Sequence, residues 1–206
     1  MKPTDQKIYL ASKSPRRREL LRQIGVEFEL LMLRDHTSRG PEVSETPLPG
    51  ESPDDYVARV ALEKAQCAHQ TMLLRKLPVR PVLAADTTVT VDGRILGKPV
   101  GMTEAVSMLK SLSGRTHQVL TSIAVQHLED TWQITQRSDV AFGIVPDDVI
   151  RAYCTLQEPY DKAGGYAVQG QAAVFIEAIA GSYSGIMGLP LFETAQLLRQ
   201  AGIRIL

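Results

Sequence analysis

The chain has 206 residues, of which 44% are hydrophobic, a length and composition typical of a folded protein with one large domain or two lobes sharing a core. Basic and acidic side chains balance at 23 each, and aromatic residues make up only 5%. We therefore expect no broad basic surface for nucleic acid or for an anionic membrane. The polar start "MKPTDQK" and the lack of a long apolar run predict neither a signal peptide nor a membrane span, so we expect a cytoplasmic protein.

The first half of the chain alternates between strand and helix patterns. Its expected elements are, in chain order, a strand at 7–11, a helix at 15–24, a strand at 27–33, a proline-rich loop or lid at 34–55 and a long helix from 52 to about 74. Ser14 and Pro15 are a typical helix start, and Gly25 is a typical helix end. Tyr56 and Val60 are expected on the apolar side of the long helix.

The second half is expected to begin with a buried strand that has a polar corner at Asp86 and a hairpin turned by Asp92 and Gly93. Thr103 is the expected N-cap of the next helix. The remaining expected elements are a strand pair at 116–128 and 131–145, a helix at 146–157, a glycine-rich loop and strand at 161–183 and an amphipathic helix at 189–203. Because no linker separates independent domains, residues 1–206 are expected to form a single α/β domain with a mixed sheet.

Three arginines, Arg16 to Arg18, occupy the first turn of the first expected helix. Cations are unfavourable there, since the helix N-terminus carries unpaired N–H groups and the positive end of the helix dipole. The hydroxyls of Ser12 and Ser14, the helix N–H groups and the guanidinium forks together suit a phosphate. The glycines of a P-loop are missing. The alternative is a capped helix with a solvated basic face.

Asp86 in "LAADTTV" interrupts an apolar strand, where a carboxylate can bind Mg²⁺ or accept a proton from water. The alternative is a turn that opens the hairpin. Lys64 in the long helix and Lys98 between glycine and proline are candidate anion ligands, or else exposed solubilising side chains. Glu45 in the polar loop is a candidate second carboxylate for a metal, or else an ordinary loop residue.

The segment "DKAGGYAVQG" combines glycines with Gln169. Glycines allow the backbone to approach a ligand closely, and a glutamine amide offers the acceptor and donor that match the edge of uracil or thymine. A tight turn between strands would explain the glycines equally well. The four histidines show no metal-ligand spacing, and Cys67 and Cys154 are expected to be buried free thiols of a reducing compartment.

Taken together, the ordered motifs of the chain resemble the Maf family of nucleoside triphosphate pyrophosphatases. The motifs are "LASKSPRRREL", "GESPDDYVARVALEKA", "AADTTV", "ILGKPV", "LSGRTHQV", "DKAGGYAVQG" and "GLPLFET". The resemblance implies an α/β fold with a mixed twisted sheet flanked by helices, two lobes around a central cleft, and often a homodimer. It also implies hydrolysis of a nucleoside triphosphate to the monophosphate and pyrophosphate with a divalent cation, Mg²⁺ or Mn²⁺.

Carried over position by position, the resemblance assigns roles to nine residues. Asp86 matches the catalytic acidic residue, and Glu45 matches a second acidic residue near the metal. Lys64 and Lys98 match positions that bind the phosphates and take part in catalysis. The remaining residues match substrate-binding positions, and they are Ser12, Arg16, Arg17, Thr87 and Gln169. The subgroup that prefers dTTP and UTP has the types found at 16, 87 and 169, whereas the 7-methyl-GTP subgroup has Trp and Glu at 16 and 169. An insertion at 34–41 leaves Asp35 and Glu42 as alternatives to Glu45.

Two other functions compete with a dTTP/UTP pyrophosphatase. The first is a purine-directed pyrophosphatase of the inosine triphosphate type, which has related chemistry and another base pocket. The second is a non-catalytic nucleotide-binding regulator of cell division and septum formation, with which Maf proteins are associated. The joint presence of Asp86, Lys98 and Arg17 favours catalysis.

Overall fold

The computed structural model describes residues 6–32 and 43–205, and a seven-stranded mixed sheet forms its centre. The sheet order is β2-β1-β3-β5-β6-β7, with β4 paired to β3. The strands are β1 (Ile8–Leu10), β2 (Phe28–Leu30), β3 (Val82–Val91), β4 (Arg94–Leu96), β5 (Thr116–His127), β6 (Asp130–Phe142) and β7 (Ile176–Ala180). The fold class expected from the sequence, a mixed sheet flanked by helices, is confirmed.

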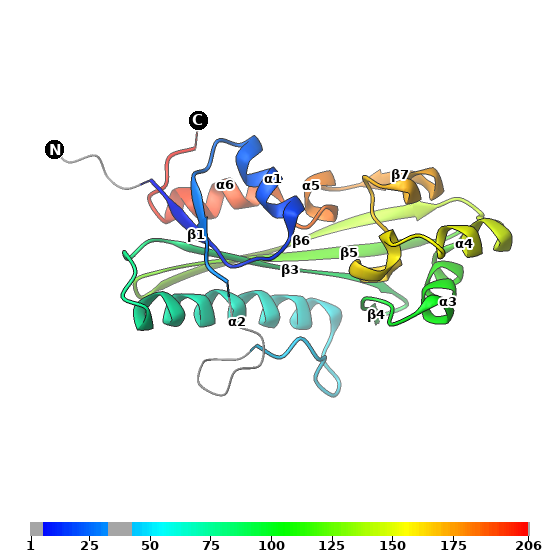
Figure 1. Cartoon of the computed structure of the whole chain (residues 1–206), viewed down its shortest axis with the longest axis horizontal. Helices are drawn as coiled ribbons and strands as arrows, with labels where there is room; N and C mark the ends of the chain where they lie inside the picture. The colour runs from blue at the N-terminus through cyan, green and yellow to red at the C-terminus, as the bar shows by residue number, and fades with distance from the viewer. Residues whose placement is uncertain (1–5, 33–42, 206) are drawn as a thin grey trace.

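Helices cover both faces of the sheet, with α2 on one face and α1 and α6 on the other (Figure 1). The α-helices are α1 (Pro15–Gln23), α2 (Pro53–Leu74), α3 (Met102–Leu112), α4 (Asp147–Tyr153), α5 (Tyr183–Ile186) and α6 (Leu191–Gln200). The 3₁₀ turns are η1 (Glu158–Asp161), η2 (Ala163–Gly165) and η3 (Gln171–Phe175). None of the helices in the described part of the chain is both long and apolar enough to cross a membrane.

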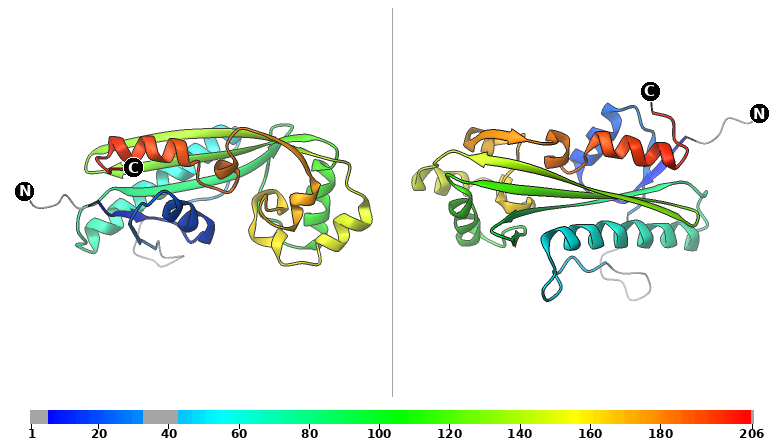
Figure 2. Two further views of the ribbon diagram at one scale, coloured as in Figure 1. Left: turned by 90° about the horizontal axis from the view of Figure 1, so that it is seen from above. Right: turned by 180° about the vertical axis from the view of Figure 1, so that it is seen from behind.

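The alternation of side chains along β3 divides the core between the two faces of the sheet. Leu83 and Ala85 pack with α1 and α6, whereas Val82 and Ala84 pack with α2. A further apolar cluster joins the far ends of β3, β5 and β6 to α3, α4 and η3, and forms the second lobe seen at one end of the sheet in Figure 2. Asp86 follows the alternation and faces the α2 side.

Local capping signals predict the helix ends well. Ser14 accepts a hydrogen bond from the N–H of Arg17 at the start of α1, and Ser52 accepts one from the N–H of Asp55 at the start of α2. Gly25 follows α1 with a φ of 70°, the left-handed conformation that glycine adopts most readily. The expected burial of Tyr56 and Val60, and of the free thiols Cys67 and Cys154, is also confirmed.

Two local predictions are wrong. Asp86 does not form a corner, because the threonines and valines that follow it continue β3 in pairing with β5, where Asp86 lies opposite Ser122. Thr103 is not the N-cap of α3, because Gly101 holds that position and the Glu104 side chain accepts the N–H of Val100 at 2.7 Å.

Part of one edge of β3 has no neighbouring strand among the described residues. On this edge β1 pairs only with Val82 and Leu83, and β4 pairs only from Val89 onward. Asp86 lies between these two stretches, where no described strand pairs with β3 on that side. Asp86, Thr87 and Thr88 in this stretch line a cleft.

The proline-rich loop at 34–55 is described only from Val43 onward. Residues 43–51 form neither helix nor strand, as expected. The insertion at 34–41, and with it the alternatives Asp35 and Glu42, lies outside the described residues. The role of this loop as a lid stays a prediction.

Replacing Ser52 with alanine removes the side-chain acceptor for the N–H of Asp55 at the start of α2. We expect a loss of about 1 kcal/mol in the free energy of unfolding, measured by urea denaturation. Ser107→Ala makes the same chemical change at an exposed position inside α3, where alanine is the better helix former, and it should cost nothing. Equal losses in the two variants would contradict the capping account.

Candidate active site

A cleft of about 1120 Å³ lies between the two lobes, a size that suits a nucleotide. Its walls come from the loop before α1, the segment around Glu45, α2, β3, the loop after β4 and the glycine-rich segment after η1. Every site residue predicted from the sequence lines this cleft: Ser12, Arg16, Arg17, Glu45, Lys64, Asp86, Thr87, Lys98 and Gln169. Sequence segments far apart in the chain therefore meet at one surface.

The centre of the site is an ion-pair triad of Glu45, Lys64 and Asp86. The Lys64 ammonium lies 2.8 Å from Asp86 Oδ1 and 2.7 Å from Glu45 Oε1. Lys64 extends from the face of α2 that packs on the sheet, and Asp86 is only 8% exposed. Glu45 reaches the same ammonium from its loop, and its side chain is 57% exposed.

The electrostatics of the triad favour the ionised form of Glu45. Partial burial opposes ionisation of Glu45, but the charge and hydrogen bond of Lys64, together with Lys98 and Arg17, hold its pKa below the ordinary value. Glu45 and Asp86 both approach the Lys64 ammonium, and carboxylate oxygens are also the ligands that Mg²⁺ and Mn²⁺ prefer. No cluster of three or more metal-ligating side chains occurs among the described residues. Glu45 and Asp86 could hold a metal whose other ligands are water and phosphate.

Arg17 ties α1 to the unpaired edge of β3. Its guanidinium donates to Ala85 O at 2.8 Å, to Gly188 O at 2.7 Å, to Ser12 Oγ at 3.3 Å and to Thr87 Oγ1 at 3.1 Å. Burial lowers its pKa, and the negative charge of Asp86 opposes that shift. Because most of its N–H groups bind protein oxygens, Arg17 holds the gap in the sheet in shape in addition to its predicted role at phosphate.

The hydroxyl of Thr87 takes part in the same network. It accepts from Arg17 and lies 3.0 Å from Thr121 Oγ1, which donates to Gly185 O at 2.8 Å. Arg17, Thr87, Thr121 and Gly185 are thus linked by side-chain contacts in which the Thr87 hydroxyl accepts from both Arg17 and Thr121. Thr87 thus contacts Arg17, the residue that binds the edge of β3, a contact that the sequence analysis did not predict.

Arg16 faces the second lobe across the cleft. Its guanidinium is half-buried, and burial lowers its pKa, while the charges of Asp161 and Glu158 oppose the shift. These two acidic residues belong to η1, which precedes the segment that carries Gln169. Two of the three positions in which the sequence resembles the dTTP/UTP subgroup, 16 and 169, therefore lie on opposite walls of one cleft.

Glu158 holds the segment after Gln169 in place, a role that the sequence analysis missed. Its carboxylate accepts the backbone N–H groups of Gln171 at 2.9 Å and Ala172 at 3.3 Å, at the start of η3, and the hydroxyl of Tyr153 at 2.9 Å. Gly170 packs directly over this carboxylate. The sequence around Glu158 shows no capping pattern, because the backbone N–H groups that its carboxylate binds lie 13 and 14 residues further along the chain.

Comparison with known proteins identifies the family of the chain and several relatives. A family model described as Maf-like protein matches residues 7–201. A dTTP/UTP pyrophosphatase of Aromatoleum aromaticum is 54% identical over 203 residues, 98% of each chain. A dTTP/UTP pyrophosphatase of Nitrosospira multiformis is 53% identical over 201 residues, 98% of this chain and 97% of the relative. The Ham1 protein of Staphylococcus aureus aligns over 66% of this chain and 71% of its own, with 16% identity and a TM-score of 0.44.

The chain belongs to the Maf family. The family match and the relatives cover nearly the whole chain, and they confirm the resemblance drawn from the ordered motifs.

Replacing Gly170 with alanine tests the support of the Gln169 segment. The added Cβ would lie 2.2 Å from Glu158 Oε1, so the carboxylate must move and leave two backbone N–H groups without their acceptor. We expect a loss of about 1–3 kcal/mol in the free energy of unfolding. Gly97→Ala is the matched control, since a Cβ there meets nothing within 4 Å. A Gly170→Ala protein as stable as the control would contradict the packing described.

Proposed function

We propose that this chain is a pyrophosphatase that hydrolyses dTTP and UTP to the monophosphate and pyrophosphate, and so removes these nucleotides from the pool. The observation that carries the proposal is the meeting of Asp86, Glu45 and Lys64 in a cleft that Arg16, Arg17 and Lys98 also line. The name shared by relatives about half identical over nearly the whole chain supports the same function.

The triphosphate binds in the basic part of the cleft. The loop before α1 brings Ser12 to the helix N-terminus, where backbone N–H groups and the helix dipole attract phosphate oxygens. Arg16 and Lys98 add positive charge from α1 and from the loop after β4. The negative charge of the bound triphosphate offsets the repulsion among the arginines in the first turn of α1 and explains their position in the sequence.

Asp86 and Lys64 act on the attacking water. The ion pair with Lys64 fixes the Asp86 carboxylate at the floor of the cleft. From there Asp86 orients a water molecule toward the α-phosphorus and receives its proton as the new P–O bond forms. The bond between the α-phosphorus and its bridging oxygen to the β-phosphate breaks, and pyrophosphate leaves. Lys64 and Lys98 stabilise the charge that develops on the leaving oxygens.

Glu45 and Asp86 would hold the divalent cation. Carboxylate oxygens suit Mg²⁺ and Mn²⁺, and their separation by one ammonium is compatible with a cation bound beside them. When bound, the cation supplies positive charge that polarises the phosphoryl oxygens. The protein contributes the orientation of the two carboxylates, which for Glu45 depends on hydrogen bonds between side chains of α2 and the backbone around Glu45.

Base selection belongs to the second lobe. Gln169 lies on the wall of the cleft after the glycines of η2, and its amide can pair with the O4 and N3–H edge of uracil or thymine. Cytosine presents the reverse pattern, so a Gln169 amide held in one orientation rejects it. Thr87 contributes through its bond to Arg17.

The buried free thiols fit the proposed cytoplasmic location. A homodimer remains a prediction.

Replacing Asp86 with asparagine removes the negative charge and the proton acceptor while keeping the shape of the side chain. Pyrophosphate release from dTTP and UTP, measured with Mg²⁺ and with Mn²⁺, should fall by at least about 100-fold. Nucleotide binding, measured by calorimetry, should persist. Asp130→Asn makes the same change in an exposed residue at the start of β6 and should keep full activity.

A substrate panel of dTTP, UTP, CTP, GTP and 7-methyl-GTP separates the competing functions. The proposal predicts pyrophosphate from dTTP and UTP above the other nucleotides. A purine preference would overturn the base assignment to Gln169. Binding without turnover in the unmodified protein would overturn catalysis and favour the regulator.

A further inference from the structure

We propose that Arg59 and Tyr56 are positioning residues that hold Glu45 against Lys64 and Asp86. The inference rests on the proposed function, since it concerns the carboxylate assigned there to the metal. The residues to be held are 43–51, here called the Glu45 segment, which contain neither helix nor strand. Such a segment needs side-chain contacts to fix its conformation, because ordering each free residue costs roughly 1–2 kcal/mol.

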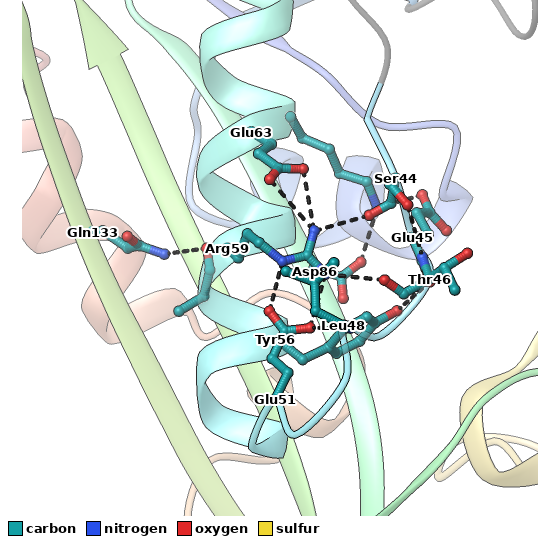
Figure 3. A network of polar contacts seen from close by, with 12 residues as sticks. Ser44, Glu45, Thr46, Leu48, Glu51, Tyr56, Arg59, Glu63, Asp86 and Gln133 are labelled. Atoms are coloured by element: carbon teal, nitrogen blue, oxygen red, sulfur yellow. Dashed lines mark hydrogen bonds and ion pairs between the residues drawn. The ribbon is translucent and has the colours of Figure 1, made fainter.

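Three consecutive carbonyl groups of the Glu45 segment bind side chains of α2. Arg59 Nη1 donates to Ser44 O at 3.1 Å, the Tyr56 hydroxyl donates to Glu45 O at 2.9 Å, and Arg59 Nη2 donates to Thr46 O at 3.1 Å (Figure 3). The backbone is therefore held at Glu45 itself and on both sides of it. This places the Glu45 carboxylate within reach of Lys64, which extends from the same helix.

The guanidinium of Arg59 is fully occupied by this arrangement. It forms a bidentate pair with Glu51, with Nε at 2.6 Å from Oε1 and Nη2 at 2.9 Å from Oε2, and it also donates to Glu63. Together with the two carbonyls, these acceptors use every N–H of the side chain. The Arg59 and Glu51 side chains are only 19% and 7% exposed, so the pair is shielded from water. A lysine has neither the fork nor the planar geometry to replace it.

Tyr56 and Arg59 also stack on each other. The Arg59 guanidinium lies 5.7 Å from the centre of the Tyr56 ring, a cation–π distance. Tyr56 itself is buried and lines the cleft, and its hydroxyl donates to the backbone of Glu45.

Tyr56→Phe removes one hydroxyl and keeps the ring stacked on Arg59, so it is the mildest test. It should lower kcat/KM for dTTP by about 2- to 10-fold, the cost of one neutral hydrogen bond. In a Glu45→Gln background the same substitution should have no further effect, since the carboxylate it positions is already absent. Arg59→Lys should lower kcat/KM for dTTP by at least about 10-fold, and it too should have no further effect in the Glu45→Gln background. Thr71→Val is the matched control, because it removes a hydroxyl bond to a backbone carbonyl further along α2.

Two measurements without turnover separate positioning from general stability. Hydrogen exchange of the Glu45 segment should rise in Tyr56→Phe and Arg59→Lys while exchange in β3 and β5 stays unchanged. Mn²⁺ binding in the presence of α,β-methylene-dTTP, followed by electron paramagnetic resonance, should weaken about as much as kcat/KM. Uniformly faster exchange, or full additivity of Tyr56→Phe with Glu45→Gln, would overturn the inference.

The outcomes also distinguish this inference from the proposed function. If the unmodified protein releases no pyrophosphate from any nucleotide, the proposed function fails, and hydrogen exchange alone decides whether Arg59 and Tyr56 hold the segment. If the unmodified protein is active and both variants match Thr71→Val, the positioning role fails and the proposed function stands.

Discussion

The site depends on the ion pairs that the Lys64 ammonium makes with two carboxylates. The ammonium lies within ion-pair distance of both Glu45 and Asp86, whose negative charges would otherwise repel each other in a partly desolvated cleft. Helix α2 carries this lysine, and it also carries the two side chains that bind the backbone around Glu45. One helix packed on one face of the sheet therefore fixes the carboxylates relative to each other and to the cleft.

The sheet contributes an unusual constraint of its own. Strand β3 lacks a described neighbour on one edge between its contacts with β1 and β4, and Arg17 binds the carbonyl of Ala85 there. A partly buried charged group is tolerated in this position because carbonyl and hydroxyl oxygens accept most of its N–H groups. The gap gives access to Asp86 without breaking the pairing of β3 with β5 on the other edge.

Local signals in the sequence predict much of the fold, and long-range contacts explain what they miss. Ser52 caps α2 through the N–H of Asp55 three residues later, so its spacing is visible in the sequence. Asp86 was expected at a corner because its own type disfavours strands, whereas pairing with β5 decides its conformation. The contacts of Arg59 and Glu158 with backbone groups elsewhere in the chain leave no residue pattern to recognise. The ordered motifs, by contrast, identified a set of residues that all line one cleft.

In the proposed reaction, the cleft directs water to the α-phosphorus of a pyrimidine nucleoside triphosphate. Hydrolysis of dTTP in ¹⁸O-labelled water, with the products analysed by mass spectrometry, shows which phosphorus atom is attacked. We expect one labelled oxygen in the thymidine monophosphate and none in the pyrophosphate. Label in pyrophosphate would mean attack at the β-phosphorus, and label in orthophosphate would mean attack at the γ-phosphorus. Either result would contradict the role given to Asp86 and Lys64.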